Sequence, residues 1–381
     1  MEDQASERIH PSRPAIDVEE TARAVGDLVH PLRSSRAWLD ILSRMWAWLF
    51  LLGMFLFFSI AGKGFFTPFN LQAILANMAI LTIIAIGQTF VIISGGIDLS
   101  AGWVMGMVAV VAALTMNQFP EGTPLGLVVL TSAIVGLTAA WIAGLVNGLL
   151  IARLNVPPFI ATLGMFGIAR GVGFLLSGGM PVAIYTKGLG FLGNGFLLYH
   201  HPIAGWSWLG LPPGLQQADL RNVTGFLPFV VIVVIVLLTF AHLLLSRTRF
   251  GLHIYAIGGN KEAALRAGIP VARSTVAIYL LSATFAAFAG LVYTTRFTNG
   301  AANAGEAMLL DSIAAVVIGG ASLFGGAGTV MGTLIGALII AVLANGLVIM
   351  AVNPFWQFIA VGIVIIIAVL IDQAREQLVR G

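Results

Sequence analysis

The chain has 381 residues, of which 59% are hydrophobic and only 9% are charged, and its mean hydropathy is +0.98. Because soluble domains carry about 25% charged residues, this composition excludes a soluble protein and predicts that lipid surrounds most of the chain. The net charge of +3 is too small and too dispersed to indicate binding to nucleic acid. Without cysteine, the chain has neither a disulfide framework nor a thiolate metal site.

Residues 1–44 are polar and lack the apolar run of a secretory signal peptide, so we interpret them as a partly disordered cytoplasmic N-terminal tail. The following apolar runs predict transmembrane helices, because lipid cannot satisfy the polar groups of an irregular backbone. We therefore expect an all-α integral membrane protein, with a transmembrane domain over 45–372 and a cytoplasmic tail over 373–381. The expected helices number about ten and cover residues 45–61, 71–94, 100–116, 125–151, 156–176, 226–245, 275–295, 307–323, 330–350 and 355–371.

The orientation of these helices follows from the basic residues, which are retained near helix ends on the cytoplasmic side. If the N-terminus is cytoplasmic, most Lys and Arg residues fall in cytoplasmic segments, so both termini are expected in the cytoplasm. Residues 177–225, which carry the interfacial aromatics Trp206 and Trp208, then form an ordered periplasmic loop. Residues 246–273 become the principal cytoplasmic connection.

Two segments five expected helices apart resemble each other. Asn147 and Asn345 each precede a glycine and three aliphatic residues, and in each case a second asparagine and a proline follow. Because five is an odd number of helices, the two copies would cross the membrane in opposite senses, as in the inverted repeats that are common in transporters. Chance similarity among small and aliphatic residues is the alternative explanation.

Four motifs occur in order along the chain: Gly95–Ser100, Asn147–Leu163, Gly251–Ala264 and Gly319–Gly328. Together they resemble the ribose-type family of bacterial ABC permeases, which import pentoses and hexoses, and the resemblance covers roughly residues 71–372. It implies a membrane-spanning permease subunit of an ATP-driven monosaccharide importer in the bacterial inner membrane. It also implies three partners: an ABC ATP-binding subunit that carries ATP and Mg, a periplasmic sugar-binding protein, and a second permease chain in a homodimer or heterodimer.

The connection at 246–273 contains the pattern of a short cytoplasmic helix. Asn260 is a favourable N-cap, Gly268 suits the left-handed position after a helix, and Pro270 forbids its continuation. This helix resembles the family's coupling helix, which sits in a cleft of the ATP-binding subunit; the alternative is a connector that is charged only for solubility and topology. The expected coupling residues are Asn260, Lys261, Glu262, Ala263, Ala264, Arg266, Ala267 and Gly268.

Polar side chains within the expected helices either line the translocation path, where they would bind sugar hydroxyls, or join helices to one another. Asp98 and Ser100 follow a Gly-Gly break and are expected to cap the third helix. Glu306 and Asp311 are expected at the outer start of the eighth helix, where they would stabilise its dipole. The candidates for the path are Asn77, Gln88, Asn147 and Asn345.

The sequence has no Gly-x-x-x-x-Gly-Lys-Ser/Thr phosphate-binding loop, so we expect a separate subunit to hydrolyse ATP and this chain to bind no cofactor. Its six histidines show no metalloprotease spacing, and we interpret the pair His200–His201 as polar surface of the outer loop, so we predict neither catalytic residues nor a metal site. Two rival functions remain. One is a secondary sugar transporter or facilitator, which would use Asp98, Glu306 or Asp311 for ion coupling. The other is an ABC permease for branched-chain amino acids.

Overall fold

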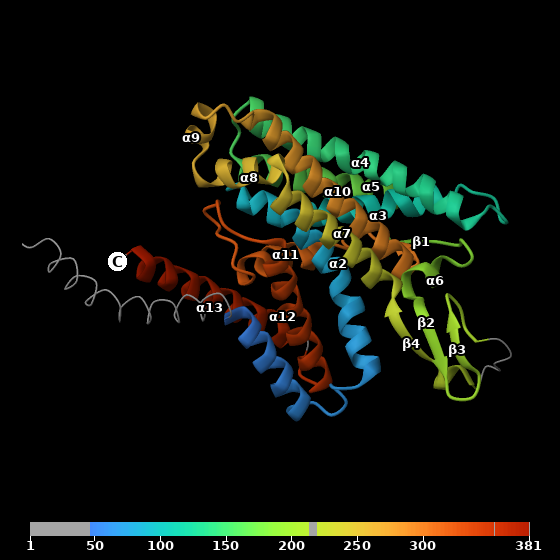
Figure 1. Cartoon of the computed structure of the whole chain (residues 1–381). Coiled ribbons are helices and arrows are strands. Elements are labelled where there is room, and N and C mark those ends of the chain that lie inside the picture. The colour runs from blue at the N-terminus through green and yellow to red at the C-terminus, as the bar shows by residue number, and fades with distance from the viewer. Residues whose placement is uncertain (1–45, 213–218, 354, 381) are drawn as a thin grey trace, which may run out of the picture. The chain divides into compact units, whose positions relative to one another are not determined.

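The computed structural model describes residues 46–212, 219–353 and 355–380, so the expected N-terminal tail at 1–44 lies outside the described residues. Ala47–Gly381 form one compact unit, which is mostly helical (Figure 1). Among the described residues, six helices are long and apolar enough to cross a bilayer. They are α2 (Pro68–Ile93), α4 (Leu125–Arg153), α5 (Pro158–Ser177), α7 (Phe229–Arg247), α10 (Val271–Phe297) and α12 (Val330–Ile349).

The other four expected helices also have helical counterparts, but these are shorter or less apolar along their length. They are the helix Trp46–Ala61, α3 (Ala101–Met116), α11 (Glu306–Ile318) and α13 (Phe355–Arg380). The total of ten spans therefore stays a prediction.

α2 is the central helix of this unit, because it packs against α7, α10, α11 and α12. In its most apolar window 94% of the residues are buried, against 22% in α4 and 28% in α5. The exposed Leu, Ile and Val side chains of α4 and α5 need no protein cover in a membrane, since lipid tails are as apolar as they are. Burial thus separates a protein-enclosed helix from helices with exposed apolar faces.

The expectation of an all-α chain is incomplete in the segment expected as the periplasmic loop. β2 (Phe196–His201) pairs antiparallel with β3 (Gly205–Trp208) and with β4 (Thr224–Pro228), and β1 (Val182–Ala183) pairs with β5 (Asn299–Gly300). The short helices α6 (Leu189–Asn194) and η1 (Asp219–Asn222) complete the segment. Strands of two to six residues are too short for a period-two pattern to be recognised in the sequence.

The two predicted repeats run in opposite senses. The C-terminal end of α4 lies beside the start of α10, where Gly148 packs on Val276. By contrast, it is the N-terminal end of α12 that lies near the coupling segment at 246–273, because Tyr255 donates a hydrogen bond to the carbonyl of Gly328, just before α12. The matching asparagines after the two helices act differently, since Asn155 has a positive φ and Asn353 accepts a hydrogen bond from the backbone N–H that starts α13. The direction supports an inverted repeat, which stays a prediction.

Segment 298–305, which joins α10 to α11 through the short strand β5 and a turn, packs along α3 through small residues. A Cβ added to Gly106 would overlap the carbonyl of Ala302, and one added to Gly102 would overlap that of Gly305. The segment follows α3 from Ala109 to Gly102, away from the end of α3 that packs beneath the outer loop. α11 therefore begins beside the start of α3 and away from the outer loop, so the expected outer position of Glu306 and Asp311 is wrong.

Substituting Gly106 with alanine is expected to lower the free energy of unfolding by about 1–3 kcal/mol, because the added methyl group pushes α3 away from segment 298–305. Gly171→Ala on α5 is the matched control, since a Cβ there meets no atom within 4 Å, and alanine is the better helix former. Thermal unfolding of the purified protein in detergent, followed by circular dichroism, measures both. Equal losses in the two variants would contradict the tight packing.

Candidate functional site

The coupling segment consists of two helices, α8 (Arg249–Gly259) and α9 (Lys261–Arg266). Asn260 caps α9 as expected, because its Oδ1 accepts a hydrogen bond of 2.9 Å from the backbone N–H of Ala263. Gly268 has a φ of +79°, the left-handed conformation that glycine adopts without strain. The short helix and both of its ends are thus where the sequence predicts them.

Seven of the eight expected coupling residues are exposed on α9 and its ends, and Ala264 is the exception. Ala264 is only 3% exposed and packs with Ile257 and Val271, so it attaches α9 to the rest of this chain. The hypothesis that Ala264 permits close seating of a partner is therefore wrong. Leu265, which sequence reasoning missed, is 55% exposed and presents an apolar side chain on the same short helix.

Glu262 and Arg266 form an ion pair on the surface of α9. Arg266 Nη2 lies 4.0 Å from Glu262 Oε2, and both side chains are about 85% exposed. Exposed pairs of this kind add little stability, since water screens them and two long side chains must be ordered. Both charges are consequently accessible to a partner.

α8 contacts the two glycine-rich interruptions of the bundle, which we name the first break (94–100, between α2 and α3) and the second break (319–329, between α11 and α12). Gly258 approaches the Ile93 carbonyl so closely that a Cβ would overlap it, and the Gly326 N–H donates to the same carbonyl at 2.8 Å. The Tyr255 hydroxyl donates to the Gly328 carbonyl at 2.7 Å. Burial raises the pKa of Tyr255, so its hydroxyl remains a donor at neutral pH.

The first break is held inside the bundle by the carboxylate of Asp98, which is only 3% exposed. The Ser100 backbone N–H and hydroxyl donate to Asp98 Oδ1 at 2.9 and 2.6 Å, and the Ser282 hydroxyl of α10 donates to Oδ2 at 2.7 Å. Gln88 of α2 donates to the Asp98 carbonyl at 2.6 Å. The expected cap at the start of α3 is present only in part. Ser100 is the N-cap but makes no side-chain cap hydrogen bond, whereas Asp98 accepts the Ser100 backbone N–H and also contacts α2 and α10 through Gln88 and Ser282.

The four candidate path residues lie in different surroundings. Gln88 and Asn147 are buried in the polar network of the first break, where the Asn147 amide donates to Ser100 Oγ at 3.0 Å. Asn345 and Asn70 exchange two hydrogen bonds of 3.0 Å between α12 and α2. These contacts join helices. The remaining candidate, Asn77, is exposed and accepts a hydrogen bond of 2.7 Å from Arg296.

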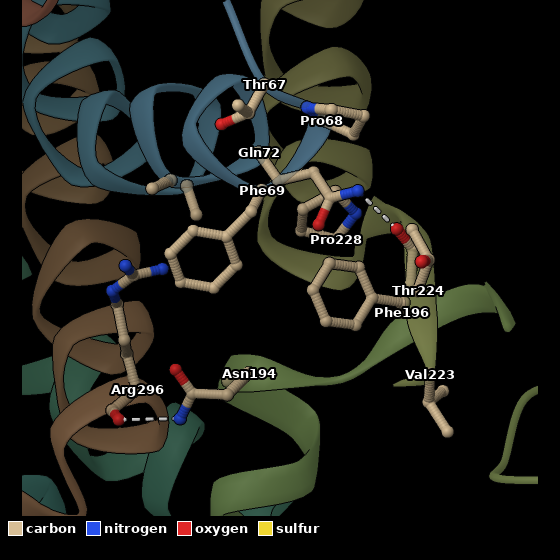
Figure 2. Close-up of a pocket in the computed structure, with 14 residues that line it drawn as sticks. Thr67, Pro68, Phe69, Gln72, Asn194, Phe196, Val223, Thr224, Pro228 and Arg296 are labelled. Atoms are coloured by element: carbon tan, nitrogen blue, oxygen red, sulfur yellow. Dashed lines mark hydrogen bonds between the residues drawn. The ribbon is translucent and has the colours of Figure 1, made fainter. Parts of the chain in front are cut away.

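Arg296 points into a cavity of about 630 Å³, which we name the outer pocket (Figure 2). The pocket lies where the start of α2, α6, β4 and the end of α10 meet. Figure 1 shows the sheet of β2, β3 and β4 at one end of α7 and α10, and α8 and α9 at the other end. The described lining residues are Thr67, Pro68, Phe69, Gln72, Ala73, Ala76, Gly193, Asn194, Phe196, Val223, Thr224, Gly225, Pro228 and Arg296.

Direct contacts fix the walls of the outer pocket. The Gln72 amide donates to the Gly225 carbonyl and so links α2 to β4, as the dashed line in Figure 2 marks. The Asn194 amide donates to the Arg296 carbonyl at 2.8 Å and links α6 to α10. Gly193 approaches Thr295 too closely for any side chain. The sequence analysis missed this pocket because its parts are distant in the chain.

A buried helical core with six candidate membrane spans, interrupted by two glycine-rich breaks, defines this chain as a multi-pass membrane protein. Residues 70–369 match the family described as branched-chain amino acid transport system / permease component. The chain belongs to this family. No solved structure shows a significant match.

Curated relatives cover most of this chain and of their own length. The ribose import permease protein RbsC of Bacillus subtilis is 39% identical over 84% of this chain and 89% of its own. The fructose import permease protein FrcC of Rhizobium meliloti is 36% identical over 91% and 88%, respectively. The galactose/methyl galactoside import permease protein MglC of Escherichia coli K12 is 36% identical over 82% and 88%.

Replacing Asp98 with alanine is expected to lower the free energy of unfolding by at least about 2 kcal/mol, because buried donors on Ser100 and Ser282 lose their shared acceptor. Ser282→Ala removes one of these bonds and is expected to cost about 1 kcal/mol. The double variant should lose less than the sum of the two, since both changes disrupt the same contact. Unfolding in detergent measures all three, and strict additivity would contradict a direct Asp98–Ser282 interaction.

Proposed function

We propose that this chain is the membrane-spanning permease subunit of an ATP-driven importer for a monosaccharide. The observation that carries the proposal is similarity over more than 80% of this chain to import permeases named for ribose, fructose and galactose. The family description names branched-chain amino acids, but the curated relatives that cover the chain are named for sugars. Neither an amino acid permease nor a secondary transporter is favoured by these names.

As an import permease, the chain is a transport subunit and not an enzyme, and ATP and Mg belong to a separate ATP-binding subunit. We infer that this subunit binds α9 through Asn260, Lys261, Glu262, Ala263, Arg266, Ala267 and Gly268. The exposure of these residues and the short, well-capped helix that presents them support the assignment. Leu265 adds an apolar contact at the centre of the same surface.

The remaining parts of the assembly follow from the same assignment. We place the chain in the bacterial inner membrane with about ten spans and both termini in the cytoplasm, so that α8 and α9 are cytoplasmic and β2–β4 periplasmic. A periplasmic sugar-binding protein would dock on the outer loops. A second permease chain, identical or homologous, would enclose the translocation path with this one.

The contacts of α8 give a mechanism for coupling. When the ATP-binding subunits close, a displacement of α9 is passed to α8, because the two helices are separated only by Asn260. α8 contacts the Ile93 carbonyl through Gly258 and the second break through Tyr255, so both breaks receive the displacement. Repacking of these breaks would change which side of the membrane the path opens to.

Reconstitution tests the proposed function directly. The chain is incorporated into liposomes with its ATP-binding subunit and its binding protein, and ATP hydrolysis is measured with D-ribose, D-fructose, D-galactose or L-leucine. Stimulation by a sugar that requires the binding protein supports the proposal. Stimulation by leucine alone, or sugar flux without any ATP-binding subunit, would replace it with one of the two rivals.

Gly258→Ala is expected to reduce ATP-driven sugar uptake by about tenfold or more while ATP hydrolysis continues, because the added methyl group would overlap the Ile93 carbonyl at the end of α2 and the Gly326 nitrogen of the second break. Gly259→Ala is the matched control, since the neighbouring glycine has no atom within 4 Å of an added Cβ. Uptake and hydrolysis are measured in the same liposomes. Equal uptake by the two variants would contradict transmission through the Gly258–Ile93 contact.

The charges of α9 are tested by exchange. Glu262→Arg alone should weaken stimulated ATP hydrolysis if the partner binds this carboxylate. The double exchange Glu262→Arg with Arg266→Glu preserves the ion pair within the chain. Stimulated ATP hydrolysis stays low if the partner binds the individual charges, and it returns if only the ion pair is required. A single variant with unchanged hydrolysis and unchanged assembly would show that neither charge serves coupling.

A further inference from the structure

The outer pocket combines the kinds of groups that bind a small polyhydroxylated ring. Its volume of about 630 Å³ lies within the range of about 300–1,000 Å³ that is usual for small-molecule sites. Phe69 and Phe196 supply aromatic surface for the apolar C–H faces of a sugar ring. Gln72, Asn194 and Thr224 supply amide and hydroxyl groups, and they come from three different elements of the wall.

Arg296 is the main donor in this pocket. Its guanidinium has five N–H donors in a fixed plane, and Asn77 accepts from Nη2 at 2.7 Å. Because Asn77 lies on α2 and Arg296 at the end of α10, this bond fixes the direction of the guanidinium across the pocket. The donors that remain suit a pair of adjacent hydroxyl groups, which a planar fork can bind together.

Apart from one cation, the lining is neutral and suits a ligand with many hydroxyl groups. Arg296 is the sole charged residue among the described residues that line the pocket, and the other polar groups there are neutral. A phosphate or lipid headgroup carries charge that is expensive to remove from water unless several donors compensate it. A sugar carries no charge, and its many hydroxyls match scattered amides.

The pocket is also preorganised. The Gln72–Gly225 bond holds α2 to β4, and the Asn194–Arg296 bond holds α6 to α10, without any ligand. A site whose walls are already joined loses little entropy when it binds, so weak hydroxyl contacts are sufficient for measurable affinity.

We propose that the outer pocket is a monosaccharide subsite of the permease itself, where a pentose or hexose binds after the binding protein releases it. The proposal rests on the proposed function and extends it, because it assigns sugar recognition to named residues of the membrane subunit. Arg296 and Thr224 bind hydroxyls, Phe69 packs against the ring, and Asn77 positions Arg296. α2 joins this subsite to the first break, because the first residues of α2 line the pocket and its last residue, Ile93, directly precedes the break.

The test is direct binding of radiolabelled D-ribose, D-fructose and D-galactose to the complete permease–ATPase complex in nanodiscs, without the binding protein. Saturable binding of at least one sugar is expected, and Arg296→Gln should weaken it by about tenfold or more. Arg296→Lys should recover part of the affinity. Lys187→Gln, which changes an exposed cation outside the pocket, should bind like the native chain.

Three outcomes would overturn the subsite: no saturable binding to the native complex, equal affinity in Arg296→Gln, or loss of bound phosphatidylglycerol from Arg296→Gln with sugar binding unchanged. The last would make the pocket a lipid site. Stimulation of ATP hydrolysis by the sugar-loaded binding protein, measured on the same native complex, tests the proposed function separately. A complex that is stimulated but binds no free sugar therefore refutes the subsite alone.

Discussion

Hydrocarbon offers no hydrogen-bond partner to a backbone that leaves the helical form, so a chain that is interrupted inside a membrane must bring its own partners. The first break does so through Asp98, which gathers donors from Ser100 and Ser282 on both of its oxygens. Gln88 and Thr162 bond the carbonyls of Asp98 and Ile97. This polar contact joins the start of α3 to α10 through Ser282 and to α2 through Gln88, and α2 and α10 also pack directly on each other.

α2 reaches from the outer pocket to the contact with α8. Its first residues line the outer pocket, and its last carbonyl, at Ile93, receives the second break and faces α8. The helix between them is 26 residues long and almost fully enclosed by protein. This one enclosed helix therefore connects the outer pocket to the contact between α2 and α8.

The sequence was sufficient where a feature depends on local residues. Apolar runs located the helices, and Asn260 and Gly268 located the ends of α9, because capping is decided within a few positions. Features that depend on distant contacts could not be read. The burial of Ala264, the partners of the candidate path asparagines and the outer pocket all require knowing which helices are neighbours.

The start of α11 illustrates the same limit more sharply. Its hydrophobic residues predict a span, yet its depth is set by the fit of segment 298–305 against glycines of α3. The residues of α11 alone do not predict this packing. A prediction made from its composition alone therefore placed Glu306 and Asp311 at the outer surface. The position of α11 follows instead from the close packing of the glycines at 102, 106, 300 and 305.

The depth at which α11 begins constrains how the protein is made. Thirteen residues of helix extend about 20 Å, short of the roughly 30 Å of hydrocarbon that a bilayer presents. Such a segment cannot be inserted as an independent span during synthesis. Its main neighbours are α2, which precedes it in the chain, and α12, which follows it, so its place in the bundle depends on helices synthesised both before and after it.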